Sequence, residues 1–439
     1  MLFKACSAPL LLRVWGWAGS LTIRNAVSGY GALVWLSLIS ILTVPIYIRL
    51  LGVSEWGLVA ACASLQVLSN FIDAGFSQIV PRWAAQEARS PARLHQYVAL
   101  FRQVYLVLGL LLFLVLQVTA GYVSHHWFQV SINRADALEL AIRIVSFQFF
   151  FQFINNLHIG LWNGLQHQVL ANTRACLFGT LKHAAALTSL MIWTPQVWIY
   201  ALAFAIVAFL EVCINAITVR QMLALRSVSE TFTKLPLGPL LKEVSVLSGG
   251  ILLGLLVSQL DRIILSRTVD LESFGIYTIV ATVALAFLQL QAPVTRAYFP
   301  ILVEEIQARG RVSGTHMKKL LVGTIFACTL PALLTCALAP QILALWMHDP
   351  KIVSIGTAPL RLLLLAIALN SLYGCIYQVI IAKGQSRRVI QFNFVSLVGA
   401  AVLILALGNS GGILLGGMIW VSTSLIQLML GVAWYIKNR

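Results

Sequence analysis

The side chains that could do chemistry in this chain are charged residues placed inside long apolar runs. Residues 46–82 and 258–300 share one layout, in which the end of one apolar run is joined by a short acidic turn to a second run. The later stretch carries Asp261, Arg262 and Arg296 within its apolar runs. Burying an ionisable group unpaired at membrane depth costs several kcal/mol, so such residues indicate a functional site. The pattern predicts recognition of a charged ligand, or exchange of an ion, inside a membrane.

Composition places the chain in a membrane. Its 439 residues are 59% hydrophobic and 10% charged, with a mean hydropathy of +0.89, whereas soluble domains carry about 25% charged residues. Lys and Arg outnumber Asp and Glu by 30 to 14, and cytoplasmic loops of membrane proteins collect basic residues. The loops explain this excess without nucleic acid, so no nucleic-acid partner is expected. We predict an all-α polytopic membrane protein.

Twelve apolar segments have the length of about 20 residues that a membrane-spanning helix needs. They are residues 27–50, 57–80, 104–124, 144–165, 175–194, 197–218, 245–266, 275–299, 320–346, 358–382, 390–408 and 412–436. Most of the basic residues fall in the connections on the side of the two termini, which predicts that both termini are cytoplasmic. No connection is long enough to form a soluble domain.

The two halves of the sequence repeat each other. At an offset of 218 residues the matched pairs are Arg24 with Lys242, Gly31 with Gly249, Arg49 with Arg267, and Gly57 with Gly275. Six helices in each half give both halves the same orientation, so a pseudo-two-fold axis along the membrane normal is expected, with the binding site between the halves near the midplane. The predicted units are a cytoplasmic N-terminal segment that could form an interfacial helix (1–26), a six-helix bundle (27–218), a cytoplasmic linker (219–244), a second six-helix bundle (245–436) and a cytoplasmic tail (437–439).

Polar residues form stripes along several of these helices. The second segment carries Gln66, Asn70, Asp73 and Ser77 at spacings of four, three and four, and the eighth carries Thr278, Thr282, Gln289 and Arg296. Such spacings put each set on one helix face. Hydrogen bonds that hold neighbouring helices together are one interpretation, and a hydrated cavity between the halves is the other. For Glu211 the competing interpretation is an ion pair with Lys182.

Catalytic constellations are absent from the sequence. It contains no Walker A sequence, and neither GxSxG nor HExxH occurs. The seven cysteines have no metal-binding spacing. We therefore expect neither an enzyme nor a cofactor.

Two motifs resemble a known family. LLGVSEWG (50–57) followed by FIDAGFSQIVPR (71–82), and QLDRIILSRTVDLESFGIYTIV (259–280) followed by Phe-Pro at 299–300, are similar to the paired motifs of the Wzx-type polysaccharide flippases. These flippases belong to the multidrug/oligosaccharidyl-lipid/polysaccharide exporter superfamily. Trp56 replaces the usual Tyr, and Pro81 precedes Arg82. Neither change removes a charge.

The resemblance implies a function. It implies transfer of an undecaprenyl-diphosphate-linked oligosaccharide from the inner to the outer leaflet of the bacterial inner membrane, for O-antigen (lipopolysaccharide) or exopolysaccharide assembly. A glycan polymerase and a chain-length regulator are the implied partners, and H⁺ or Na⁺ is a possible coupling ion. The candidate substrate-binding residues are Asp73, Arg82, Arg262, Arg296, Gln289, Asn70 and Gln66. The candidate ion-coupling residues are Asp73, Asp261 and Glu211.

Two other functions remain open at this point. A multidrug or organic-cation antiporter of the same superfamily should have an acidic or strongly aromatic cavity, whereas the intramembrane charges here lean basic. A membrane glycosyltransferase or glycan polymerase needs a long outer loop with catalytic residues, and the outer loops here are short.

Overall fold

The computed structural model describes residues 21–224 and 237–438, and these residues are helical apart from turns and one isolated bridge between Gln129 and Asp270. Eleven helices among them are long and apolar enough to cross a membrane, and α10 (Leu237–Thr268, 32 residues) is of similar length. The prediction of an all-α polytopic membrane protein is confirmed. Parts of the predicted N-terminal segment (1–26) and linker (219–244) lie outside the described residues.

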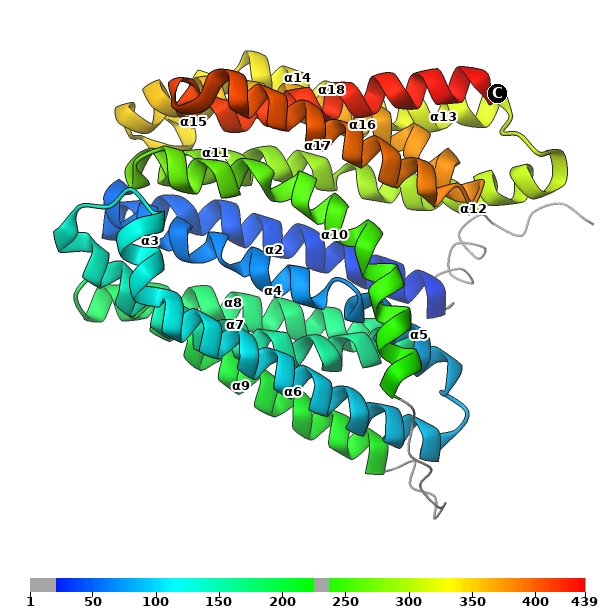
Figure 1. Cartoon of the computed structure of the whole chain (residues 1–439), viewed down its shortest axis with the longest axis horizontal. Helices are drawn as coiled ribbons and strands as arrows, with labels where there is room; N and C mark the ends of the chain where they lie inside the picture. Colours follow the sequence, from blue (N-terminus) through cyan, green and yellow to red (C-terminus); the bar gives the residue numbers. More distant parts are fainter. Residues whose placement is uncertain (1–20, 225–236, 439) are drawn as a thin grey trace, which may run out of the picture.

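The helices form two groups that lie side by side (Figure 1). The first group consists of α2 (Leu21–Leu51), α3 (Val53–Ser64), α4 (Gln66–Asp73), α5 (Phe76–Gln86), α6 (Pro91–Tyr122), a π-helical turn (Val123–Trp127), α7 (Ile132–Gly164), α8 (Gln168–Ile192) and α9 (Val197–Ala224). The second consists of α10, α11 (Leu271–Gln289), α12 (Gln291–Arg309), α13 (Gly314–Thr324), a π-helical turn (Ile325–Thr329), α14 (Leu330–Ala337), α15 (Ala339–Met347), α16 (Pro350–Ala382), α17 (Ser386–Leu407) and α18 (Leu414–Lys437). We call these groups the N-half and the C-half.

The two halves share one packing order. In the N-half α7 packs against α6 and α9, and α8 packs against α2 and α9. In the C-half α16 packs in the same way against α14 and α18, and α17 packs against α10 and α18. This correspondence agrees with the repeat in the sequence.

Three predicted spans are not single helices. Residues 57–80 are divided among α3, α4 and α5, residues 275–299 break at Leu290, and residues 320–346 contain a π-helical turn and a further break at Leu338. Pro293 has no N–H to donate to the carbonyl of Gln289, the last residue of α11, which accounts for the break there. In the third span the π-helical turn lies directly before Pro331, where a helix bond is likewise lost. The break at Leu65 has no comparable signal in the sequence.

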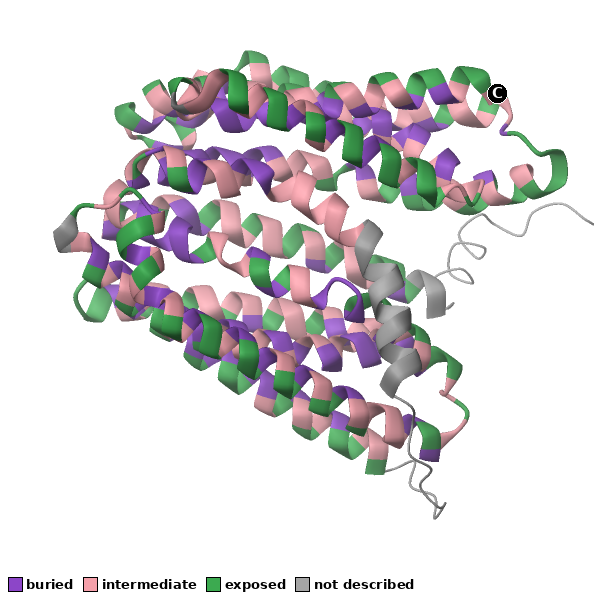
Figure 2. Ribbon diagram, viewed as in Figure 1, coloured by how far each residue is buried: buried purple, intermediate pink, exposed green. Residues whose placement is uncertain are grey.

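The halves meet tightly at the end of the molecule opposite the described ends of the chain (Figures 1 and 2). A buried cluster joins Val44 and Ile48 of α2 to residues of the C-half, which are Ile276, Ile279, Met347 and Ile352. The indole Nε1 of Trp346 donates to the carbonyl of Ile41 at 2.9 Å, and the indole Nε1 of Trp127 donates to the Ser266 hydroxyl at 3.0 Å. These apolar and polar contacts seal this end.

Candidate functional site

A cavity of about 250 Å³ lies between the two halves. Its walls come from α2 of the N-half and from α10 and α11 of the C-half. The lining residues are Leu36, Ser37, Ser40, Ile41, Arg262, Thr282, Leu285, Ala286 and Gln289. The predicted position of the site, between the halves, therefore corresponds to a real cavity with one charged group.

That charged group is the guanidinium of Arg262. Among the described residues it has no hydrogen bond and no ion pair, and it also lines a second cavity that extends into the C-half. The neighbouring Asp261 is 3% exposed and accepts a hydrogen bond from the Tyr277 hydroxyl at 2.6 Å. Its Oδ1 atom has no hydrogen bond of normal geometry within the described part of the chain, although Trp420 is close enough to interact with the carboxylate. Arg262 thus lines both the cavity between the halves and the one that extends into the C-half.

Two residues of the predicted stripe on the eighth span join Arg262. Thr282 and Gln289 line the same cavity. Arg296 does not line it, because it lies on α12 beyond the break at Leu290. Its guanidinium carbon sits 5.5 Å from the ring centroid of Tyr30, and the Tyr30 hydroxyl donates to the carbonyl of Ala292 at 3.4 Å. This contact joins the halves on the side of the cavity nearer the described ends of the chain.

The residues of the stripe predicted for the second span lie in different surroundings. Asp73 is buried inside the N-half, where it accepts hydrogen bonds from the Tyr105 hydroxyl at 2.8 Å and the Asn156 amide at 3.0 Å. Gln66 lines a separate cavity of about 220 Å³ in the N-half, whereas Asn70 is exposed. These three residues lie on the single short helix α4, and only Ser77 lies beyond the next break, on α5. Arg82 is exposed on α5, away from the cavity between the halves.

Glu211 is held in a buried network in the N-half. The Lys182 ammonium lies 2.7 Å from its Oε2 atom, and the Asn155 amide donates to its Oε1 atom at 2.9 Å. Asn215 in turn donates to the Asn155 side-chain oxygen at 2.8 Å. The alternative interpretation of Glu211, an ion pair with Lys182, matches this geometry.

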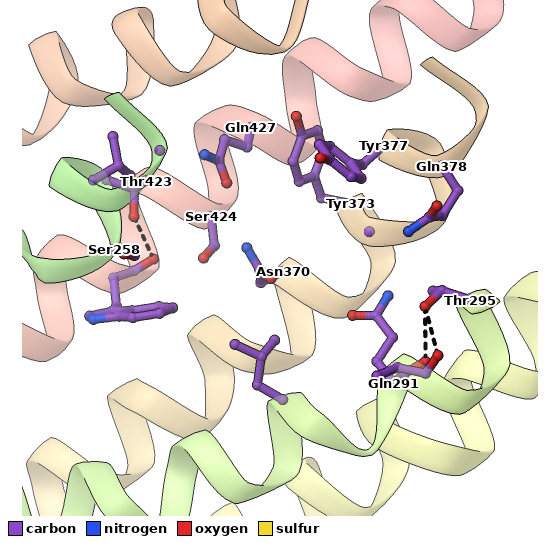
Figure 3. A pocket seen from close by; sticks show the side chains of 16 residues that line it. Ser258, Gln291, Thr295, Asn370, Tyr373, Tyr377, Gln378, Thr423, Ser424 and Gln427 are labelled. Atoms are coloured by element: carbon purple, nitrogen blue, oxygen red, sulfur yellow. Dashed lines mark hydrogen bonds between the residues drawn. The ribbon is translucent and has the colours of Figure 1, made fainter. Parts of the chain in front are cut away.

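A further polar cavity was not predicted as a site. It occupies about 400 Å³ within the C-half and is lined from α10, α11, α12, α16 and α18 (Figure 3). Its polar lining residues are Ser258, Gln291, Thr295, Asn370, Tyr373, Tyr377, Gln378, Trp420, Thr423, Ser424 and Gln427. The spacing of Asn370, Tyr373 and Tyr377 on one face of a helix was a visible signal. The polar residues of the last helix complete the cavity, and no single helix reveals it.

Comparison with protein families identifies the chain. The family model described as polysaccharide biosynthesis protein matches residues 24–305, more than half of the sequence. The chain belongs to the polysaccharide biosynthesis protein family. The resemblance to Wzx-type flippases drawn from its motifs is confirmed at this level. A comparison with curated proteins finds no significant match.

Solved structures show which fold this family member has. It is similar to the lipid II flippase MurJ in an inward closed conformation, with a TM-score of 0.71 and 13% identity over 94% of this chain and 88% of that one. It is also similar to the inward-facing conformation of a multidrug resistance MATE family transporter of the MOP superfamily, with a TM-score of 0.58 and 16% identity over 94% of each chain. A MOP superfamily transporter from Pyrococcus furiosus matches with a TM-score of 0.53 and 15% identity over 95% of this chain and 92% of that one. The family member therefore has the transporter fold of that superfamily.

The network around Glu211 allows a prediction about stability. Changing Glu211 to Gln should lower the free energy of unfolding by about 3 kcal/mol, because it leaves the Lys182 ammonium buried without a counter-charge. The double variant Lys182→Met with Glu211→Gln should recover much of this loss. Thermal unfolding of the purified protein in detergent measures both effects. A single variant as stable as the unmodified protein would contradict a structural role for the pair.

Proposed function

We propose that this family member transfers an undecaprenyl-diphosphate-linked oligosaccharide across the bacterial inner membrane, as a step in O-antigen or exopolysaccharide assembly. The observation that carries the proposal is the unpaired Arg262 guanidinium in the cavity between the halves. A guanidinium forms strong charge-assisted hydrogen bonds with phosphate oxygens. The diphosphate is the charged part of such a substrate, and Arg262 would hold it between the halves.

The cavity argues against the two other functions. An organic-cation antiporter needs an anionic or aromatic binding surface, and no carboxylate lines the cavity between the halves in the described residues. The only carboxylate lining a cavity that joins it is that of Asp261, which already accepts a hydrogen bond from Tyr277. A glycosyltransferase needs positioned acids or bases at an aqueous surface, and among the described residues that line the cavity between the halves Arg262 is the one titratable group. Transport without chemical change of the glycan fits this arrangement better.

Transport would proceed by alternating access. The halves would separate at the end sealed by Gly57 and Gly275 while the contact between Tyr30 and Ala292 holds them together near the other end. We place both termini in the cytoplasm, so the sealed end would face the outside. A glycan polymerase and a chain-length regulator would then take up the product at the outer leaflet.

We also propose Asp73 as the coupling group. It has two neutral hydrogen-bond donors and, among the described residues, no ion-pair partner. By contrast, Glu211 is neutralised by Lys182. A carboxylate without a permanent counter-charge can bind and release H⁺ or Na⁺ during a cycle.

A reconstituted system tests both proposals. Proteoliposomes would contain the lipid-linked oligosaccharide extracted from a host strain that lacks this gene, and an impermeant lectin outside would report the accessible glycan. Without ATP, the fraction of glycan that the lectin can bind should rise. It should start at the fraction already in the outer leaflet and end at all of the lipid-linked oligosaccharide. An imposed pH or Na⁺ gradient should accelerate the rise, and Asp73→Asn should remove only this acceleration.

Different outcomes would contradict the proposed transport and the proposed role of Asp73. Strict dependence on ATP, or no rise above protein-free liposomes, would contradict the proposed transport. Acceleration by either gradient that persists in Asp73→Asn would remove Asp73 as the coupling group while leaving transport intact.

A further inference from the structure

The cavity within the C-half has a lining of unusual chemistry for a membrane protein interior. It is rich in amides, hydroxyls and aromatic rings, and not one of its lining residues is charged. The amides of Gln291, Asn370 and Gln427 point into one shared space (Figure 3). Its volume of about 400 Å³ falls in the range of roughly 300–1,000 Å³ that is usual for small-molecule sites.

Several of these polar groups lack protein partners. The Tyr373 hydroxyl belongs to a side chain that is 5% exposed, and it has no hydrogen bond within the described residues. The side-chain amides of Asn370 and Gln378 likewise make none there. A buried polar group without a partner costs free energy, so natural structures usually satisfy it with protein, water or ligand. This cavity therefore keeps donors and acceptors available for a polar occupant.

The cavity continues toward Arg262. It shares Ser258, Leu288 and Trp420 with a second cavity, and that second cavity includes Arg262 and Leu285 of the space between the halves. The three cavities are therefore neighbours, and a ligand whose charged group is bound by Arg262 would extend its neutral part through the second cavity into the C-half.

Among uncharged ligands, a carbohydrate matches the lining of the C-half cavity best. A sugar ring presents hydroxyls at its rim and apolar C–H groups on its faces. Amides match the hydroxyls, while Tyr373 and Tyr377, whose ring centroids are 6.3 Å apart, offer surfaces for the faces. A lipid chain would leave the amides of Asn370 and Gln378 unpaired, and an organic cation would find no carboxylate among the described lining residues.

Within the described residues, the corresponding position of the N-half has a different lining. At the 218-residue offset, Gln291 corresponds to Asp73, and the Asp73 carboxylate is already bound by Tyr105 and Asn156. The cavity at this position is smaller, about 220 Å³, and mostly apolar. A second N-half cavity of about 750 Å³, between α8 and α9, is also mostly apolar. Of these two positions, only the one in the C-half therefore adds a polar cavity beside the cavity between the halves.

We propose that the C-half cavity is the binding site for the uncharged sugar residues next to the diphosphate, so that it sets the preference for glycosylated over bare carrier lipid. This inference rests on the proposed function. Arg262 contributes affinity for both lipids, whereas Tyr373 and Asn370 contribute only for the glycosylated one.

Binding to the purified full-length protein in nanodiscs tests the proposal with two probes. One is undecaprenyl diphosphate, and the other is the lipid-linked oligosaccharide extracted from the host strain lacking this gene. The unmodified protein should bind the second more tightly. Tyr373→Phe should reduce that preference about three- to tenfold, the loss expected for one hydrogen bond, and Asn370→Leu should reduce it by at least as much. Neither should change the Kd for undecaprenyl diphosphate.

Tyr435→Phe is the matched control, because Tyr435 is in the same half but does not line the cavity. Tyr373→Phe removes a hydroxyl that has no protein partner, so its thermal stability should not fall, and a binding loss cannot be assigned to misfolding. An unchanged preference in both cavity variants would overturn the sugar site while leaving the proposed function standing. Failure of the unmodified protein to bind either probe would overturn both.

Discussion

Replacing Arg262 with Gln is expected to abolish transport of the lipid-linked oligosaccharide. The guanidinium is the only charged group that lines the cavity between the halves in the described residues. Hydrogen bonds to charged groups contribute about 1.5–3 kcal/mol each, so losing even one of them lowers affinity for a diphosphate by about ten- to a hundred-fold or more. Surface glycan in a strain that depends on this gene, and lectin-accessible glycan in proteoliposomes, measure the loss.

Two further variants separate binding from folding. Arg262→Lys keeps the charge but not the planar fork that matches phosphate, so it should retain part of the activity. Arg220→Gln removes the same charge from an exposed position at the end of α9 and should transport normally. Arg262 has no hydrogen bond or ion pair to lose within the described part of the chain, but its charge acts on the buried Asp261 carboxylate. Thermal unfolding of Arg262→Gln and of the charge-keeping Arg262→Lys therefore separates a loss of transport from a loss of folding. Normal transport by Arg262→Gln would contradict the proposed role.

Most of the fold followed from simple features of the sequence. Apolar runs of membrane-spanning length and the recurrence of Gly57 at Gly275 were enough to predict two similar groups of helices. The interruptions were predictable only in part. Pro293 explains the break after α11, because it has no N–H to donate the helix hydrogen bond to the carbonyl of Gln289. The break at Leu65 depends on tertiary packing, which no local signal reveals.

The site was predictable to the extent that it depends on single residues. Arg262 stood out because a charge in an apolar run is costly, and Gln289 followed from its helix face. Asp73 stood out for the same reason, yet the structure satisfies it inside the N-half. The C-half cavity was missed because its neutral side chains carry no such cost individually. Only the folded arrangement of several helices brings them around one space.

A second large loss of transport is expected from substitutions at the sealed end, where α3 and α11 cross at Gly57 and Gly275. A Cβ atom at Gly57 would lie 2.3 Å from the backbone carbonyl oxygen of Leu271. A Cβ atom at Gly275 would lie 3.0 Å from the backbone of Gly57. Backbone atoms cannot move aside as a flexible side chain can, so the helices approach this closely only because both positions are glycine.

Gly57→Ala should therefore keep the two halves from sealing, and transport should fall at least about tenfold, which corresponds to about 1.4 kcal/mol against the closed state. Gly275→Ala should have a smaller effect because its overlap is smaller. The readout is a single cysteine at Ile279, which is 0% exposed in the sealed cluster, in a background whose seven native cysteines are replaced by Ala. An impermeant maleimide should label it faster in Gly57→Ala than in the unmodified background.

Gly31→Ala provides the control, because a Cβ atom there meets nothing within 4 Å. Alanine is more favourable than glycine inside a helix by about 1 kcal/mol, so this variant should be slightly more stable and should transport normally. A general effect of Gly-to-Ala changes would appear in Gly31→Ala as well, whereas loss of the seal should appear only in Gly57→Ala and Gly275→Ala. If Gly57→Ala transports normally and the cysteine at Ile279 stays protected, the close crossing of α3 and α11 is not the gate. The seal would then depend on the apolar cluster around Val44 and Ile276 alone.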